Sequence, residues 1–228
     1  MKSRFMLGGG IALALTAGAG CVVDDSPLVI GNFHPLDQEC GAITNINVGG
    51  GSIDLSAVGG YVVAMDLSSQ TSPVWEPSPA QDDILSPYSN QIIIDTIEFD
   101  YASGGATIAS GTDRLHFVVD PATPDNWAAI ELFSGPAGAA AIAAAVPGST
   151  IEVGIRALGT TRAGVAIRTN RVVFPIYVYA SGFPGCTAPS LQAATGPCGR
   201  VGGQDGSLVG CCAPDPTTGV VDLDCLDG

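Results

Sequence analysis

Alternating apolar and polar residues in the middle of this chain restrict it to an all-β fold. Residues 150–157 have an apolar side chain at every second position, a period that is typical of a half-buried β-strand. About eight such strands, punctuated by glycine and proline turns, predict a two-sheet sandwich, and we expect an immunoglobulin-like topology. The inward sets with this spacing are Ile151, Val153, Ile155 and Ala157; Tyr61, Val63, Met65 and Leu67; Ile97, Phe99 and Tyr101; and Leu115, Phe117 and Val119.

The last predicted strand changes its inward face partway along. Val165 and Ile167 face inward in its first part, whereas after residues 169–171 the other parity is apolar. One inserted residue reverses the alternation, so we expect a bulge or a tight turn at 169–171. Because Pro175 has no N–H to donate, the strand should lie at a sheet edge where it passes that residue. The second inward set is Val172, Phe174, Ile176 and Val178.

One short helix is predicted over residues 136–146, which are rich in alanine. Pro136 suits a first helical turn, and Pro147 followed by Gly148 suits a stop. An alanine-rich helix of this length is marginal alone, so we expect it to pack as a connector through Ile142 and Val146.

The amino terminus has the layout of a secretory signal peptide. Lys2 and Arg4 precede an apolar stretch, small residues follow, and Cys21 comes directly after Gly20. A cysteine at this point resembles the bacterial lipoprotein signal, which is cut just before a cysteine that carries a diacylglycerol. Gly18 stands where that signal usually has leucine, and ordinary cleavage after the small residues 17–19 is the alternative.

Cysteine parity favours lipidation of Cys21. Without it, six of the seven cysteines remain, an even set for disulfides, whereas ordinary cleavage leaves one unpaired thiol. The tail after residue 181 has little apolar content, so cross-links must supply its constraint. Five of the six cysteines lie in this tail, and the odd count predicts that Cys40 pairs with one of them. The expected disulfide cysteines are Cys40, Cys186, Cys198, Cys211, Cys212 and Cys225.

Four regions are therefore expected along the chain. Residues 1–20 are the signal peptide, 21–41 the lipidated cysteine and a tether, 42–181 the sandwich, and 182–228 the cysteine-rich tail. Residues 22–39 have no clear period, and a second interpretation makes Leu28-Val29-Ile30 an early strand docked on the sandwich.

The charge of the chain argues against nucleic acid as a partner. The formal net charge is −14, and loss of Lys2 and Arg4 with the leader makes it −16. Such a surface repels nucleic acid and anionic lipid headgroups. All remaining basic residues are arginines, so the mature chain has no lysine.

Motifs for catalysis are absent from the sequence. It has no nucleophile elbow, phosphate-binding loop, H-E-x-x-H motif or EF-hand loop. Glu98 and Asp100 lie two apart on one strand face and are the best pair for glycoside hydrolysis, although a solvated face explains them more simply. His116 lies on a polar strand face, and His34 precedes Pro35 in the tether, so neither is a strong catalytic candidate.

Two further binding hypotheses arise from the sequence. Trp75 lies in the proline-rich excursion 68–90 and is a candidate for contact with a carbohydrate. No cofactor or metal site is expected, and calcium at the tail acids is a weaker hypothesis because no glycine-pinned ligand loop is present. Those acids are Asp215, Asp222, Asp224 and Asp227.

The combination resembles a group of uncharacterised bacterial lipoproteins. The resemblance rests on the leader ending at Cys21, residues 60–64 and 169–178 of the β region, and the tail segments 197–199 and 204–212. It implies an exported protein, lipid-anchored in the cell envelope at the outer membrane or cell surface, but no activity. We expect a binding or structural module whose partner is an envelope protein or glycan; the alternative is an envelope hydrolase that uses a carboxylate pair.

Overall fold

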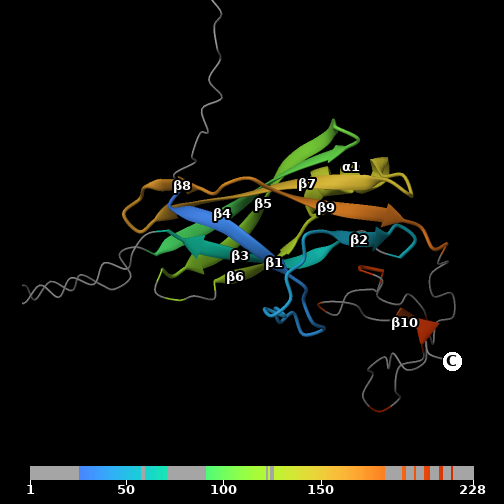
Figure 1. Ribbon diagram of the computed structural model, residues 1–228, viewed down its shortest axis with the longest axis horizontal. Helices are drawn as coiled ribbons and strands as arrows, with labels where there is room; N and C mark the ends of the chain where they lie inside the picture. Colours follow the sequence, from blue (N-terminus) through green and yellow to red (C-terminus); the bar gives the residue numbers. More distant parts are fainter. Residues whose placement is uncertain are drawn as a thin grey trace, which may run out of the picture.

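The computed structural model describes residues 26–57, 60–70, 91–121, 123, 126–182, 192–193, 198, 203–205, 211–212 and 217. Two main β-sheets, a two-stranded sheet of β10 and β11, and one short helix make up the described part (Figure 1). The elements are β1 (Leu28–His34), β2 (Gly51–Asp54), β3 (Val62–Ser69), β4 (Ile92–Ser103), β5 (Ala106–Val119), β6 (Trp127–Glu131), α1 (Gly135–Ala144), β7 (Thr150–Thr161), β8 (Ala166–Arg168), β9 (Val172–Tyr179), β10 (Gln192–Ala193) and β11 (Cys211–Cys212).

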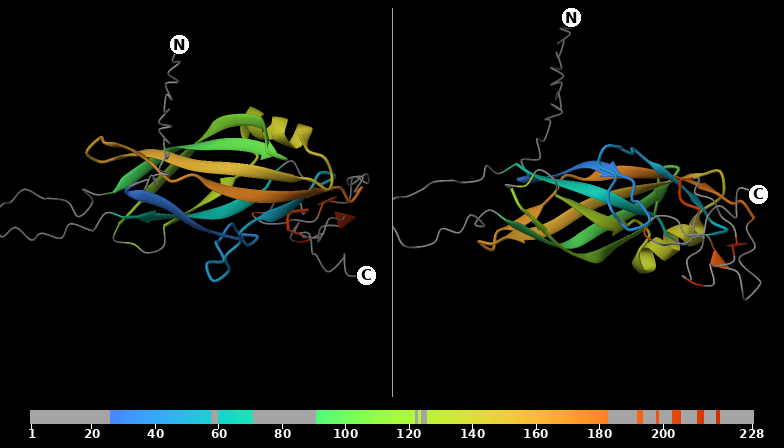
Figure 2. Two further views of the ribbon diagram at one scale, coloured as in Figure 1. Left: turned by 45° about the horizontal axis from the view of Figure 1, so that its top comes forward. Right: turned by 90° about the horizontal axis from the view of Figure 1, so that it is seen from below.

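The two main sheets form two layers (Figure 2). The small sheet has the order β1-β3-β6, and the large sheet has the order β2-β9-β7-β4-β5, with β8 beside β7. Neighbouring strands in both sheets are antiparallel except β2 and β9, which are parallel. The chain is therefore mostly β with a sandwich-like arrangement, as the alternating pattern predicts.

One apolar core lies between the sheets. The inward sets predicted on β3, β4 and β7 are buried, and those on β5 are buried or partly buried. Phe174 of β9 packs against Phe33 of β1 and Tyr61, with ring centroids 4.9 Å and 5.7 Å away. The side chain of Phe174 thus joins the large sheet to the small one.

The predicted bulge at residues 169–171 is confirmed by the strand register. Between the pairs Leu158–Arg168 and Ile155–Val172, β7 has two residues and the opposite segment has three. Thr169 fills this step: its N–H donates to the Ala157 carbonyl at 3.0 Å, and its Oγ1 accepts from the Ala157 N–H at 2.9 Å. The extra residue explains why β8 and β9 present opposite parities to the core, with Ile167 of β8 buried. The expected inward position of Val165 is wrong: it lies in the turn before β8, where its carbonyl accepts from the Thr161 N–H, and it is 60% exposed.

Pro175 lies where its missing N–H matters least. Although β9 as a whole is interior, between β7 and β2, the pairing with β2 begins only at Ile176. At Pro175 the strand therefore has β7 on one side alone, which agrees with the expected local edge.

The predicted helix is present as α1, but one of its two expected contacts is wrong. Ile142 packs against the core, whereas Val146 lies beyond the end of the helix and is 63% exposed. The helix instead makes its close contact through Gly138, where an added Cβ would lie 2.2 Å from the Phe133 backbone. A glycine in the first turn lets α1 approach the end of β6 more closely than an alanine would.

The amino-terminal segment contains a strand. Residues 28–34 form β1, which pairs with β3, so the interpretation of this stretch as a docked strand is the one the structure supports. The strand's outer edge is covered by a side chain: Asn170 accepts from the Ile30 N–H at 2.7 Å and donates to the Ile30 carbonyl at 3.3 Å. The amide thus occupies the place of a neighbouring strand.

Candidate functional site

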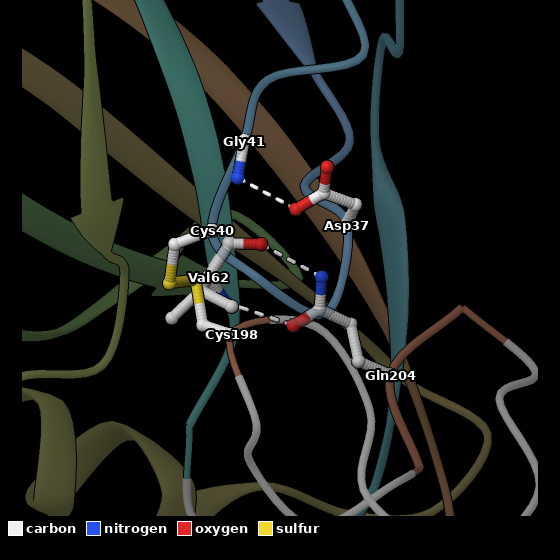
Figure 3. Close-up of a disulfide and its surroundings, with 6 residues drawn as sticks. All are labelled: Asp37, Cys40, Gly41, Val62, Cys198 and Gln204. Atoms are coloured by element: carbon white, nitrogen blue, oxygen red, sulfur yellow. Dashed lines mark hydrogen bonds between the residues drawn. A yellow bond between two sulfur atoms is a disulfide. The ribbon is translucent and has the colours of Figure 1, made fainter.

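The meeting point of the tail and the sandwich is the best-defined candidate site, and a disulfide lies at its centre (Figure 3). Cys40 and Cys198 are bonded through their sulfurs, with Cα atoms 4.4 Å apart and 158 positions between them in the sequence. This pair is consistent with the expectation that Cys40 is linked to a tail cysteine. We call this disulfide, together with Gln204 and Asp205, the tail clasp.

A tight turn after β1 positions Cys40. The Asp37 carboxylate accepts from the Gly41 N–H at 2.6 Å, and the Asp37 N–H donates to the Gly41 carbonyl at 2.9 Å. The Asp37 carboxylate lies close over Gly41, where an added Cβ would be 2.7 Å from it, so a larger residue here would displace this carboxylate. The Asp37 carbonyl also accepts from the Cys198 N–H at 2.9 Å, so one turn holds both ends of the disulfide.

A small apolar cluster lies beneath the disulfide. It contains Leu36, Val62 and Ala64, which are buried on the outer face of the small sheet, with Trp127 and Cys198 packed against them. Trp127 therefore belongs to this outer cluster and not to the main core. The cluster gives the tail an apolar surface on which to rest.

Gln204 connects the tail to both sheets. Its side-chain amide accepts from the Val62 N–H at 2.9 Å and donates to the Val62 carbonyl at 2.7 Å (Figure 3). Its backbone forms an antiparallel bridge with Ile53 of β2. Gln204 thus provides hydrogen-bond partners for the backbone of Val62, the first residue of β3 in the small sheet. Its own backbone lies along β2, the edge strand of the large sheet.

Asp205 completes the tail clasp through polar contacts. Its carboxylate accepts from the Ser52 N–H at 2.7 Å and from the Tyr61 hydroxyl, and its own N–H donates to the Ser52 carbonyl at 3.0 Å. Burial, together with the negative charge of Asp205, raises the pKa of Tyr61 well above its usual range. Tyr61 therefore stays protonated and acts as a donor, and these groups hold the tail without offering a reactive centre.

The predicted carboxylate pair lies on the outer face of the large sheet beside arginines. A Glu98 oxygen is 3.9 Å from the Arg156 guanidinium and 3.6 Å from that of Arg168. An Asp100 oxygen is 3.3 Å from Nε of Arg171. Both acids thus have cationic neighbours, which is the arrangement expected of a charged, solvated sheet face.

A small cavity lies at the side of the sandwich, between β4, β5 and β6. Its volume is about 70 Å³, and Ile97, Phe99 and Leu115 line it beside Asp113 and Glu131. Buried Tyr101 donates to the Leu132 carbonyl at 2.7 Å. Burial raises the pKa of Tyr101, and the charges of Asp113 and Glu131 add to this shift. The opening is much smaller than a ligand pocket of roughly 300–1,000 Å³.

His34 occupies a different place from the one its sequence context suggests. It is 4% exposed, on the outer face of β1, with Nε2 2.7 Å from Oδ2 of Asp66 and Nδ1 2.7 Å from the Ile46 carbonyl oxygen. Burial alone would lower the pKa of His34, but the hydrogen bonds to Asp66 and Ile46 and the Asp66 charge raise it overall. His116 is exposed on β5, as its strand parity predicts.

Several predicted site residues lie outside the described residues. These are Cys21, Trp75, Cys186, Cys225 and the four tail acids considered for calcium (Asp215, Asp222, Asp224 and Asp227). Cys211 and Cys212 form β11, whose backbone pairs with β10. Among the residues that the structure does describe, no three histidine, cysteine or acidic side chains gather as a metal site would require.

Sequence reasoning missed the polar residues that hold the strand edges together. Gln204 and Asp205 lie in an irregular segment that has no period to detect, and Asp66 is one polar residue on the outer face of β3 whose partner cannot be read from the strand pattern. Asn170 is different because the change of parity at 169–171 marks its position. That signal locates the bulge but not the contact with Ile30.

Comparisons with known proteins assign no family to this chain. No protein-family model, curated protein or solved structure matches it. Within the described ranges, no helix combines the length and the apolar character needed to span a membrane.

Proposed function

We propose that this protein is exported, cut before Cys21 and held to the bacterial cell envelope by a lipid on that cysteine. The basic, apolar and small-residue order of the leader supports export. Six cysteines remain without Cys21, an even number that can all pair in disulfides, and this supports lipidation of Cys21. The place of action on this proposal is the outer membrane or the cell surface.

The Cys40–Cys198 disulfide is the observation that carries the proposal. Disulfides form and persist in exported proteins and are rare in a reducing cytosol. Here the bond links the turn after the first strand to a tail segment 158 positions later, so it holds a region that has little apolar content of its own. A protein that depends on such a bond suits an oxidising compartment.

On this proposal the sandwich is a binding or structural module, and its partner is an envelope protein or glycan. The side chains of Gln204 and Asp205 in the tail clasp hydrogen-bond to Val62, Ser52 and Tyr61 at the sheet edges, which suits a scaffold. The Glu98 and Asp100 carboxylates contact arginines, so nothing in the described residues favours the hydrolase alternative. Trp75 is the proposed contact for a glycan.

We further propose that the sandwich has an immunoglobulin-like strand arrangement. Its support is the strand order: β1-β3-β6 corresponds to strands A, B and E, and β9-β7-β4-β5 corresponds to G, F, C and C′. β2 and β9 are the parallel pair in sheets whose other neighbouring strands are antiparallel. Nuclear Overhauser contacts between Ile53 of β2 and Val178 of β9, in the pattern of parallel strands, therefore test this arrangement. Antiparallel contacts at these residues would contradict it.

Metabolic labelling with palmitate tests the anchoring proposal. The wild-type chain and Cys40→Ser should both incorporate label and fractionate with membranes, because acylation is directed by the leader. Cys21→Ser should incorporate none. Equal labelling of wild type and Cys21→Ser, or an unlabelled wild type, would contradict the proposal.

A pull-down from envelope fractions tests the binding role. The oxidised domain lacking residues 1–20 is the bait, and the same bait with Trp75→Ala is the matched control. Specific capture of one envelope protein or glycan, reduced by Trp75→Ala, is the expected result. Hydrolysis of envelope glycan by the same bait, abolished by Glu98→Gln, would instead establish the alternative.

A further inference from the structure

We propose that His34 is held as an imidazolium cation at neutral pH and acts as an alkali-sensitive latch. The latch joins the small sheet to the crossover segment 43–48, which leads from β1 into β2 of the large sheet. This inference is independent of the lipid anchor and of the partner proposed above.

The partners of the His34 ring fix its protonation state. Nδ1 is 2.7 Å from the Ile46 carbonyl oxygen, and Nε2 is 2.7 Å from a carboxylate oxygen of Asp66. A carbonyl oxygen and an ionised carboxylate have no proton to donate. A neutral imidazole has one N–H, so one of its nitrogens would present a lone pair to an acceptor. Only the doubly protonated ring donates to both partners.

Three elements meet at this ring. His34 lies at the end of β1 and pairs with Ala64 of β3, and Asp66 lies two residues farther along β3. The crossover is also held by the Val48 N–H, which donates to the Phe33 carbonyl at 2.8 Å, and by the Ile43 N–H, which donates to the Pro35 carbonyl at 2.9 Å. The bond from His34 to Ile46 is therefore the side-chain contact between these two backbone contacts.

Asp66 is the charged group that faces the ring. Residues 43–48 and the rest of β1 contain no titratable side chain. On β6, Glu131 lies opposite Val62, four positions along β3 from Asp66. In the following turn, Asp37 accepts from the Gly41 N–H, and the guanidinium of Arg168 points to Glu98. These positions leave Asp66 as the partner that balances a charge on His34.

The direction of the pH effect follows from the contacts. The pKa of His34 is raised above its ordinary value of 6.5, so the latch is complete below that pH and is lost as the pH rises through the raised value. Deprotonation removes a donor from either Ile46 or Asp66. The crossover then loses its side-chain anchor, and β2, on which Gln204 and Asp205 rest, loses support.

An NMR titration of the oxidised mature chain tests the latch. Long-range ¹H–¹⁵N spectra should show protons on both His34 ring nitrogens at pH 7, and the titration midpoint of His34 should lie above the ordinary histidine value of 6.5. As His34 loses its proton, the exchange rate of the Val48 amide with solvent should increase by more than the intrinsic rise of amide exchange with pH. A single protonated His34 nitrogen at pH 7 would overturn the proposal.

A pair of matched variants separates the latch from a passive polar contact. Asp66→Asn keeps an acceptor but removes the charge, and it should lower the titration midpoint of His34 by about 1 pH unit or more. Asp95→Asn, an exposed acid on β4 of the other sheet, should leave the midpoint unchanged. Equal midpoints in wild type and Asp66→Asn would contradict the proposal. If Asp66→Asn does not fold, the wild-type spectra decide the question.

Discussion

The sandwich and the tail clasp are held together in different ways. In the sandwich, buried apolar side chains recur at every second position of long strands, and a single core joins both sheets. In the tail clasp, one disulfide and the polar contacts of Gln204 and Asp205 hold a few residues against the sheet edges. Stability is distributed over many residues in the first region and depends on a few in the second.

This difference predicts how each region fails. Losing one core side chain weakens a cooperative unit as a whole, because every strand shares that core. Losing one clasp contact should release the tail locally while the sandwich stays folded. The tail is therefore the region that a change in redox state would release first.

The largest effect is expected in the core. Phe174→Ala removes a side chain that is 1% exposed and packs against the rings of Phe33 in β1 and of Tyr61 just before β3, so the free energy of unfolding should fall by about 3–5 kcal/mol. The matched control is Val173→Ala, next along the strand and 47% exposed, which should change it by less than about 0.5 kcal/mol. Urea unfolding measures both, and equal losses would break the distinction between core and surface.

The next effect is expected at the disulfide. Cys40→Ser with Cys198→Ser should lower the free energy of unfolding by about 2–4 kcal/mol, since the bond closes a long loop in the unfolded chain. Amide protection should be lost outright at residues 203–205 and Val62, whereas Ile155 and Val153 should exchange faster only by the factor that the fall in global stability sets. Loss of protection throughout β7 would mean that the tail and the sandwich are one unit.

A smaller effect is expected at the two amides that cover strand edges. Gln204→Ala leaves the N–H and carbonyl of nearly buried Val62 without partners and should cost about 1–3 kcal/mol. Asn170→Ala removes the equivalent contacts from Ile30. Thermal unfolding compares the two variants, and protease cleavage should increase only for Gln204→Ala if the tail is released locally. Cleavage that increases equally in both would remove the contrast between clasp and sandwich.

The smallest effect is expected on the charged face of the large sheet. Glu98→Gln breaks two partly exposed ion pairs and should change the free energy of unfolding by at most about 1 kcal/mol. The change should shrink further in high salt, because exposed charges are screened. A large, salt-independent loss measured by urea unfolding would show that this network is a structural element comparable to the core.

The parts of the fold that follow a regular sequence pattern were predictable from the sequence. The period of two placed the inward faces of β3, β4 and β7, and the parity change located the bulge at 169–171. Proline and alanine content located α1. Val146 was misjudged because the helix ends before it, and helix boundaries depend on caps and tertiary contacts as well as propensity.

The parts of the site that follow no regular sequence pattern could not be predicted from the sequence. The odd number of tail cysteines predicted that Cys40 is linked to the tail but not that its partner is Cys198, because a count of cysteines does not say which of them lie close together. Gln204 and Asp205 act through contacts across more than 140 positions, which no local pattern reports. His34 seemed unremarkable beside Pro35, and its role depends on Asp66, which is adjacent only in the folded chain.

Peptide mapping of the mature protein, isolated from membranes without reduction, tests the central claim most directly. The account predicts two products in one digest: a cross-linked peptide that joins Cys40 to Cys198, and an amino-terminal peptide that begins at acylated Cys21. Cys40 recovered as a free thiol, in a chain that still begins with Met1, would contradict both the clasp and the export of the protein.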